Sequence, residues 1–385
     1  MVTWGVYIHI PFCKRKCSYC DFASWPGREA EMEAYTSALG TEMLVRGQQM
    51  VLRHGPPATL YIGGGTPTAL TEGPLLTLLT LVQAVFGSEA KEYTVEANPG
   101  TVTPARLALL KKMGVNRLSL GVQSFDDRLL HRLGRIHSAS QAREAVRLAR
   151  EAGFANLSLD LMYGLPGQTL AGLQTDVAEA IALAPEHISI YGLQVEEGTP
   201  FFAEQQAGTL ELPPEEETEA MYDYLTEALP EAGFSRYEIS NFAKPGRESR
   251  HNLGYWQDIP YLGLGVAAHS YLEGQRYENT EDLSEYIETL EHRRLPLRSE
   301  EIMTPERHME EYAFLALRTA RGIDKRAFKK TFSRELRQVY GKKINRLLRQ
   351  GLLQETKKNI ALTRAGAKVG NQVFAEFLLE NDENA

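Results

Sequence analysis

The sequence contains few cysteines, no long apolar run and no excess of basic residues. Only three of its 385 residues are cysteine, which excludes a disulfide framework and suits a reducing compartment, so a cytoplasmic location is expected. No stretch approaches the roughly 20 apolar residues that a membrane-spanning helix requires, and the first residues lack the basic region of a secretion signal. The net charge of -8 argues against nucleic acid as a partner, because phosphate binding normally needs a basic surface.

The three cysteines lie within eight consecutive residues, as Cys13, Cys17 and Cys20 in the pattern C-x3-C-x2-C. Thiolates bind both zinc and iron–sulfur clusters, so the ligand type does not choose between them. A structural zinc site normally has four protein ligands, whereas three thiolates leave one iron of a [4Fe–4S] cluster open to a small molecule. The amino and carboxylate groups of S-adenosylmethionine suit such an iron. Two alternatives stay open: a zinc site completed by a histidine such as His9, and cysteines that are simply buried.

Short β-rich runs alternate with helical stretches from residue 6 onward, a pattern typical of βα units in a parallel sheet. Strands are predicted at 6–10, 59–62, 93–96, 117–121, 156–162 and 187–191, and a helix at 29–53. Strands after the first end in glycine or polar residues, and the active site of parallel βα folds lies at that edge. A less regular, aromatic-rich stretch follows Gly233, and from about Thr304 the pattern is helical, with a hairpin at 352–362.

Glycines and carboxylates at the strand ends are candidate cofactor contacts. Gly64 and Gly65 follow a strand directly and allow close approach of the backbone to a ligand, although a plain turn is the alternative. Glu96 and Asp160 lie among strand-forming residues, where a carboxylate needs a cation or hydrogen-bond donors. The ribose hydroxyls and ammonium group of S-adenosylmethionine would serve, as would a salt bridge to an arginine of the barrel.

Two further pairs of residues are candidates for binding. Gln123 and Arg135 carry an amide and a guanidinium that suit the carboxylate of the cofactor. His251 and Tyr255 lie in the aromatic stretch RHNLGYW, and histidine and tyrosine both ligate haem iron. A histidine with a purely structural role is the commoner case.

A basic run extends from residue 318 to residue 349, with twelve lysines and arginines against two acids. Such a run is usually the solvated face of helices. The functional alternatives are contact with an anionic membrane surface, with an acidic partner or with porphyrin propionates.

With these residues in place, the chain resembles the radical S-adenosylmethionine superfamily. The segments YIHIPFC, GGGTPT, GVQSF, DLMYGLPGQT and HNLGYW together resemble the oxygen-independent coproporphyrinogen III oxidase family over nearly the whole chain. The resemblance implies an α/β fold, a partial (βα)6 barrel of the TIM type with a small, mainly helical C-terminal domain. It places the barrel at residues 1–237, a site-covering extension at 238–303 and a HemN-like C-terminal domain at 304–385. In this superfamily a reduced cluster cleaves S-adenosylmethionine to a 5'-deoxyadenosyl radical.

The resembled family has two branches, the oxidases and the HemW-type haem chaperones. The oxidases continue the motif to a fourth cysteine, where this sequence has Phe22. They also carry a longer N-terminal arm before the motif. Both departures favour the chaperone branch, because a phenylalanine cannot replace a thiol in redox or ligand chemistry. The three hypotheses are a haem chaperone with a radical-type cluster, a coproporphyrinogen oxidase, and a radical enzyme acting on another substrate.

The resemblance also implies site residues and partners. The chaperone branch binds haem and is thought to deliver it to acceptor haemoproteins, here with membrane contact or homodimerisation as options. HNLGYW is typical of that branch, which strengthens His251 and Tyr255 as haem ligand candidates. No catalytic residue is assigned. The implied S-adenosylmethionine contacts are Tyr7, Tyr19, Gly64, Gly65, Thr66, Glu96, Gln123, Arg135 and Asp160.

Overall fold

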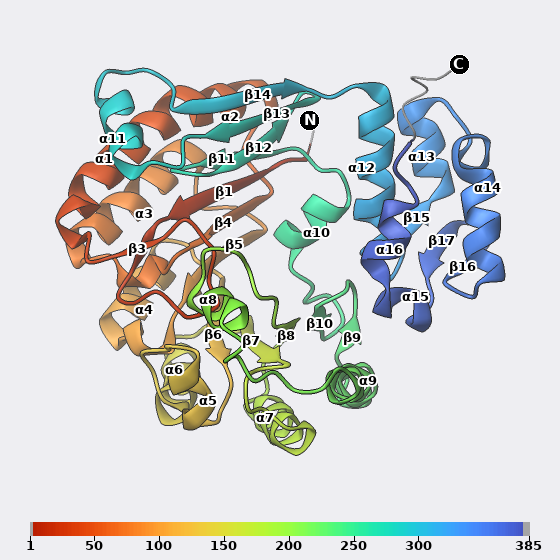
Figure 1. Ribbon diagram of the computed structural model, residues 1–385. Helices are drawn as coiled ribbons and strands as arrows, with labels where there is room; N and C mark the ends of the chain where they lie inside the picture. The colour runs from red at the N-terminus through yellow and green to blue at the C-terminus, as the bar shows by residue number, and fades with distance from the viewer. Residues whose placement is uncertain (1–2, 380–385) are drawn as a thin grey trace.

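The computed structural model describes residues 3–379, and one 12-stranded sheet forms its larger unit (Figure 1). The strand order is β14-β13-β12-β11-β1-β4-β5-β6-β7-β8-β10-β9. Six consecutive strands in this order, from β1 to β8, are mutually parallel, and each overlaps a predicted strand with ends that differ by two residues at most. These six are β1 (Gly5–Ile10), β4 (Thr59–Gly64), β5 (Glu92–Ala97), β6 (Arg117–Gln123), β7 (Leu157–Tyr163) and β8 (His187–Gly192).

Alternation along the strands separates an apolar outer face from a polar inner face. In β5, Tyr93 and Val95 belong to the main hydrophobic core, whereas Glu96 lines the inner cavity. Because successive side chains of a strand point to opposite faces, this pattern packs one face on helices and gives the other to the site. The sheet ends at β9 and β14 without closing, so the structure is a partial barrel.

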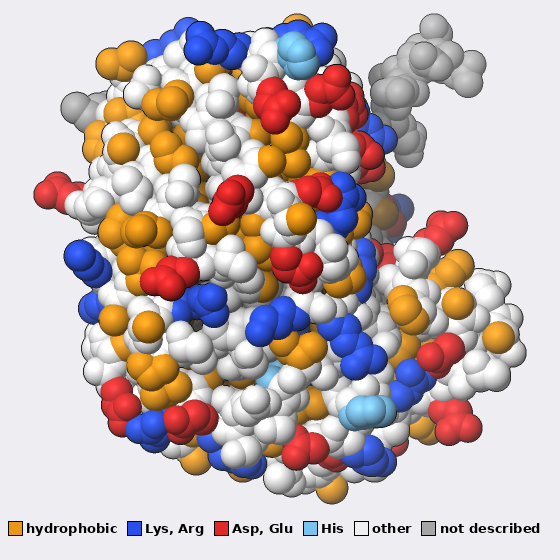
Figure 2. Space-filling model, turned by 90° about the vertical axis from the view of Figure 1, so that its left-hand side faces the viewer, with side chains coloured by type: hydrophobic (Ala, Val, Ile, Leu, Met, Phe, Trp, Pro, Cys, Tyr) orange, Lys and Arg blue, Asp and Glu red, His pale blue; other side chains and the backbone are white. Residues whose placement is uncertain are grey.

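Helices follow the strands and cover the outer face of the sheet (Figure 1). The predicted helix 29–53 is present, but a π-helical turn at Met43–Gly47 divides it. On the face formed by α1, α3 and their neighbours, side chains of both charge signs are interspersed with hydrophobic ones (Figure 2). The helices are α1 (Met32–Glu42), α2 (Gln48–His54), α3 (Glu72–Phe86), α4 (Pro104–Lys112), α5 (Asp127–Arg132), α6 (Ala139–Glu151), α7 (Leu170–Ala182), α8 (Pro200–Gln206) and α9 (Glu215–Glu231).

The stretch after Gly233 is more regular than its sequence predicts. It supplies strands to both edges of the sheet, because β10 pairs antiparallel with β8 and β11 pairs parallel with β1. The prediction was wrong because strands of two to six residues carry too little alternation to be recognised. Its elements are β9 (Ser235–Arg236), β10 (Asn241–Ala243), α10 (Arg250–Trp256), β11 (Tyr261–Leu264), β12 (His269–Leu272), β13 (Gln275–Asn279), α11 (Leu283–Glu291) and β14 (Leu297–Ile302).

The C-terminal unit has a hydrophobic core of its own and is mainly helical. The predicted hairpin is confirmed as β16 (Leu353–Glu355) and β17 (Asn359–Leu362). The helices are α12 (Pro305–Leu317), α13 (Lys325–Phe332), α14 (Leu336–Arg349), α15 (Arg364–Lys368) and α16 (Gly370–Ala375), with β15 (Ile323–Asp324) as a third strand. The residues after Leu379 lie outside the described part of the chain. Within residues 3–379, no helix has the length and apolar character to cross a membrane.

Candidate functional site

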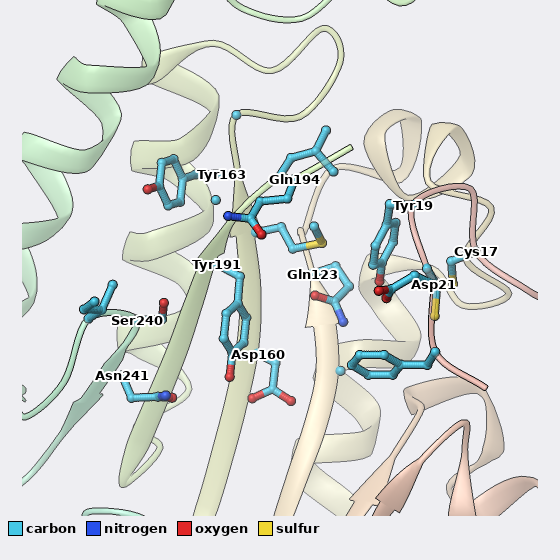
Figure 3. A pocket seen from close by; sticks show the side chains of 18 of the residues that line it. Cys17, Tyr19, Asp21, Gln123, Asp160, Tyr163, Tyr191, Gln194, Ser240 and Asn241 are labelled. Carbon is cyan, nitrogen blue, oxygen red and sulfur yellow. The ribbon is translucent and has the colours of Figure 1, made fainter. Parts of the chain in front are cut away.

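A cavity of about 1190 Å³ opens at the C-terminal ends of the parallel strands. It extends from the cysteine loop, across β6, β7 and β8, to β10 (Figure 3). The sequence-predicted residues that line it are Cys13, Cys17, Tyr19, Cys20, Gly64, Gly65, Thr66, Glu96, Gln123, Arg135 and Asp160. The structure thus brings together all the predicted cluster and cofactor residues except Tyr7.

The three cysteines lie on a loop that begins at β2 (Phe12–Cys13) and ends at β3 (Trp25–Pro26), two short strands that pair with each other. All three thiols are partly buried and free of disulfides. Burial raises the pKa of the Cys20 thiol to about 11 and also raises that of Cys13. A metal that binds these two thiols must therefore displace their protons. Bound metal cations do this readily, because they stabilise the thiolate.

The glycine run packs directly against the cysteine loop. A Cβ atom on Gly65 would lie 2.9 Å from the Phe12 carbonyl oxygen and 3.0 Å from Cys13 Sγ. Gly64 has a φ of +105°, in the region that favours glycine, and a Cβ there would lie 2.5 Å from the His9 ring. The glycines are therefore required by this close approach, which excludes a plain turn.

The two predicted carboxylates are held by hydrogen bonds and not by a salt bridge. Glu96 accepts a 2.5 Å hydrogen bond from the Tyr61 hydroxyl and a 3.2 Å bond from the Gly64 amide. Burial raises the pKa of Glu96 to about 7. Asp160 accepts hydrogen bonds of 3.1 to 3.2 Å from Ser119 and Ser158, and burial raises its pKa too. Both carboxylates thus have room to gain a cationic or hydroxyl partner.

Gln123 and Arg135 have features that are common among ligand-binding residues. Gln123 adopts a φ of +69° where the β6–β7 register shifts, a strained conformation of the kind that clusters at functional sites. Arg135 donates to Gly121 O at 2.5 Å and to Cys17 Sγ at 3.5 Å. Its Nε is buried without a hydrogen-bond partner among the described residues.

Tyr7 and Tyr255 lie in a second, smaller pocket of about 280 Å³, which they line together with Phe22, Tyr261 and His269. The Tyr7 hydroxyl is 3.0 Å from His9 Nδ1. Tyr7 does not line the main cavity, but its ring centroid lies 6.1 Å from that of Tyr61, which donates a hydrogen bond to Glu96.

His251 has the surroundings of a structural residue, and its role as a haem ligand stays a prediction. It is 3% exposed, and its two ring nitrogens lie 2.9 Å from Thr59 Oγ1 and 2.9 Å from the Tyr255 hydroxyl. Burial lowers its pKa to about 3, so the ring is neutral. Both nitrogens are engaged in this structure, one of them with the hydroxyl group of Tyr255, the other haem ligand candidate.

Several residues that line the cavity were missed from the sequence. Tyr191 on β8 points toward the same space as Asp160 (Figure 3). Ser240 and Asn241 reach the cavity from β10 and its preceding loop, and Arg318 and Asn371 from the C-terminal unit. Tyr191 had a detectable signal, since it ends a parallel strand. The others come from segments that only the tertiary fold brings to this edge.

The residues at the cysteine end fit a cluster with S-adenosylmethionine. Three free thiols, a glycine segment without side chains and an unpartnered Arg135 Nε face one space. Within residues 3–379, no three His, Cys, Asp or Glu side chains converge as ligands of a single metal ion do. His9 Nε2 lies 2.8 Å from Ala23 O, so the zinc alternative lacks its fourth ligand. A cluster does not need such convergence, because each thiolate binds a different iron atom.

Comparisons with known proteins agree with this geometry. Residues 7–180 match the radical SAM superfamily, and residues 303–369 match the HemN C-terminal domain. The chain is 40% identical over 380 residues to the haem chaperone HemW of Bacillus subtilis, covering 98% of this chain and 99% of that protein. It is 40% identical to the haem chaperone HemW of Escherichia coli over 69% of each chain. In fold it is similar to the coproporphyrinogen III oxidase HemN of Escherichia coli, with a TM-score of 0.86 and 23% identity over 98% of this chain and 90% of that one.

Proposed function

The chain belongs to the HemW family of radical S-adenosylmethionine proteins, and we propose that it is a haem chaperone that binds haem, a [4Fe–4S] cluster and S-adenosylmethionine and delivers haem to acceptor haemoproteins. The observation that carries this proposal is the 40% identity to the Bacillus subtilis haem chaperone over 99% of that protein's length. Identity over the full length includes the C-terminal unit as well as the barrel.

Cys13, Cys17 and Cys20 would hold the cluster, which supplies an electron for cleaving the carbon–sulfur bond of S-adenosylmethionine when both are bound. Glu96 and Asp160 would bind the cofactor's ammonium or ribose hydroxyl groups, since both are buried carboxylates with few partners. Gln123 and Arg135 would orient its carboxylate through an amide and a guanidinium. Thr66 would steady the loop, because its Oγ1 lies 3.6 Å from Cys13 Sγ.

The alternative function is oxidative decarboxylation of coproporphyrinogen III. The likeness to HemN is at 23% identity, which supports the fold alone. Phe22 stands where the resembled oxidases have a fourth cysteine, and it is 57% exposed beside the cysteine loop. The thiol that the resembled oxidases carry at this position is therefore missing here.

One anaerobic preparation tests both functions. Haem titration is expected to give saturable binding of about one haem per chain, with a shifted Soret band. The same preparation, supplied with S-adenosylmethionine, a reductant and coproporphyrinogen III, is expected to form no protoporphyrinogen IX in multiple turnovers. Turnover would overturn the chaperone assignment, and so would the absence of haem binding.

The proposal also covers the cellular location of the protein, its oligomeric state and its domain boundaries. The lack of a disulfide framework supports a cytoplasmic location. The basic helices α13 and α14 support delivery at a membrane surface or to an acidic acceptor. A homodimer is compatible with these features. The domain division at 303 is supported by the separate C-terminal core, whose buried members come from residues after 304. The division at 237 stays an expectation, because the 12-stranded sheet continues across it.

A further inference from the structure

The main cavity is larger than one cofactor requires. Its volume is about 1190 Å³, whereas a pocket that encloses one small ligand typically has about 300 to 1,000 Å³. The predicted S-adenosylmethionine contacts occupy the end at the cysteine loop. The other end lies where α10 stands between the sheet and the C-terminal unit (Figure 1). This end, the seam end, is lined by Asn241, Trp256, Arg318 and Asn371.

Arg318 is a half-buried cation without an acceptor at the seam end. Its guanidinium carbon lies 4.6 Å from the centroid of the Trp256 ring and 5.7 Å from that of Phe374. Among residues 3–379 its side chain forms no salt bridge or hydrogen bond, and its Nε and the Trp256 Nε1 are both buried without a partner. Stacking on aromatic rings offsets only part of the cost of desolvating a guanidinium. This wall of the cavity therefore lacks an acceptor that a ligand can bring.

The neighbouring charged groups are already engaged. Lys368 also lines the cavity, but its Nζ donates to Asp223 at 2.9 Å. The acid that feels the charge of Arg318 is Glu238, whose Oε1 accepts bonds from the Ser240 amide at 2.9 Å and from Asn241 Nδ2 at 2.5 Å. Arg318 is thus the cation that remains for an incoming anion at this end.

We propose that Arg318 binds a carboxylate of the tetrapyrrole at the seam end of the main cavity. This inference rests on the proposed haem-binding function. It specifies which residue of the protein recognises the carboxylates of the ligand. A guanidinium presents two parallel N–H donors that match a carboxylate, and haem carries two propionates. The neighbouring Trp256 Nε1 is a second donor that is expected to bind the carboxylate. This atom is buried in the structure, so the indole ring has to shift slightly to reach the ligand.

Esterified haem provides the direct test. Haem and haem dimethyl ester, which lacks free carboxylates, are titrated into the wild-type protein, the Arg318→Met variant and the Arg147→Met control, whose arginine is exposed on α6 of the barrel. Methionine keeps apolar contact with Trp256 but removes the charge. The wild type and the control are expected to bind haem about tenfold or more tightly than the diester, because a charge-assisted hydrogen bond is worth at least that much. In Arg318→Met, the ratio of the affinity for haem to the affinity for the diester is expected to fall about tenfold.

Each outcome decides the inference. If Arg318→Met keeps the preference of the wild type, Arg318 only joins the two units by stacking and the inference is overturned. If the wild type binds neither ligand, the proposed function fails and the inference with it. If Arg318→Met does not fold, Trp256→Phe is used, because it keeps a ring under Arg318 and removes only the Nε1 donor. That variant is expected to weaken haem binding several-fold more than diester binding, and equal effects on both ligands would overturn the inference.

Discussion

At the scale of single residues, Glu96 is a buried carboxylate whose negative charge destabilises the folded protein when no cofactor is bound. Burial raises its pKa from 4.5 to about 7, although Tyr61 and Gly64 donate hydrogen bonds to it. The folded protein therefore binds more protons than the unfolded chain between these two values. The stability that this group contributes is present below pH 4.5 and is lost as the pH rises to about 7.

The Glu96→Gln variant tests that dependence. In cofactor-free protein, it is expected to raise the free energy of unfolding by about 1 to 3 kcal/mol at pH 8, because glutamine keeps the shape without the buried charge. At pH 4.5 the carboxyl is neutral in the folded wild type and little change is expected. Urea unfolding at both pH values measures the difference. A stability change of equal size at both would show that the side chain's charge is not the cause.

Asp160 is the second buried carboxylate, and its hydrogen bonds to Ser119 and Ser158 fix its orientation toward the cavity. Asp160→Ala is expected to weaken S-adenosylmethionine binding by about 1 to 3 kcal/mol, the range for leaving a buried polar group unpaired. Calorimetry measures the affinity, and Asp160→Asn separates the loss of charge from the loss of shape. Unchanged affinity in a folded alanine variant would remove Asp160 from the site.

At the scale of elements, the loop between β2 and β3 is expected to bind one [4Fe–4S] cluster through its three cysteines. Anaerobic reconstitution should give about four iron and four sulfide per chain, and serine at Cys13, Cys17 or Cys20 should abolish the cluster spectrum. Phe22→Ala is the control in the same loop, since its exposed side chain carries no ligand atom. Bound zinc in place of iron, or a spectrum that survives one of the serine changes, would contradict the assignment.

The basic helices α13 and α14 form the second element with an expected function. Of the twelve basic residues between 318 and 349, five form ion pairs, with Asp324, Glu335, Glu355 and Glu376. Besides Arg318, six have no ion pair among the described residues: Arg326, Lys330, Arg334, Lys342, Lys343 and Arg349. Figure 1 shows α14 on the outer side of the C-terminal unit, away from the sheet, where it is open to a surface.

Sedimentation with anionic liposomes tests this surface. The protein is expected to co-sediment at low salt and to dissociate near 1 M, where the Debye length falls to about 3 Å. Glutamate at Arg334, Lys342 and Arg349 should abolish binding. The same reversal at Lys111, Lys112 and Arg147, on the barrel helices, should not. No association at low salt would leave α13 and α14 as solvated helices.

At the scale of the whole molecule, the barrel and the C-terminal unit are joined by apolar packing, by hydrogen bonds and by ion pairs, including the partly buried pair of Arg276 and Glu311. Ile239 packs on the C-terminal core, and a backbone hydrogen bond of 2.9 Å links Ala320 N to Tyr237 O. Arg364 forms ion pairs across the same seam with Asp223 and Glu227, but all three side chains are well exposed.

Two substitutions compare these contributions. Ile239→Ala is expected to lower the free energy of unfolding by about 1 to 3 kcal/mol, because it removes partly buried methyl groups. Arg364→Ala is expected to lower it by less than about 1 kcal/mol, as is usual for exposed ion pairs. Thermal or urea unfolding of both variants checks the order. A larger loss in Arg364→Ala would mean that charge holds the two units together.

The sequence by itself determined the βα alternation, the six parallel strands and the three-cysteine loop, because each follows from periodicity or spacing along one short stretch. It also identified Glu96, Gln123, Arg135 and Asp160, since strand ends converge at one edge of a parallel sheet. Only the tertiary structure decided that His251 is buried and bonded on both nitrogens, that Tyr7 lies in another pocket, and that Arg318 reaches the main cavity. These outcomes depend largely on residues that lie far apart in the chain, such as Thr59 and His251, and no local pattern in a sequence encodes which distant side chains will meet.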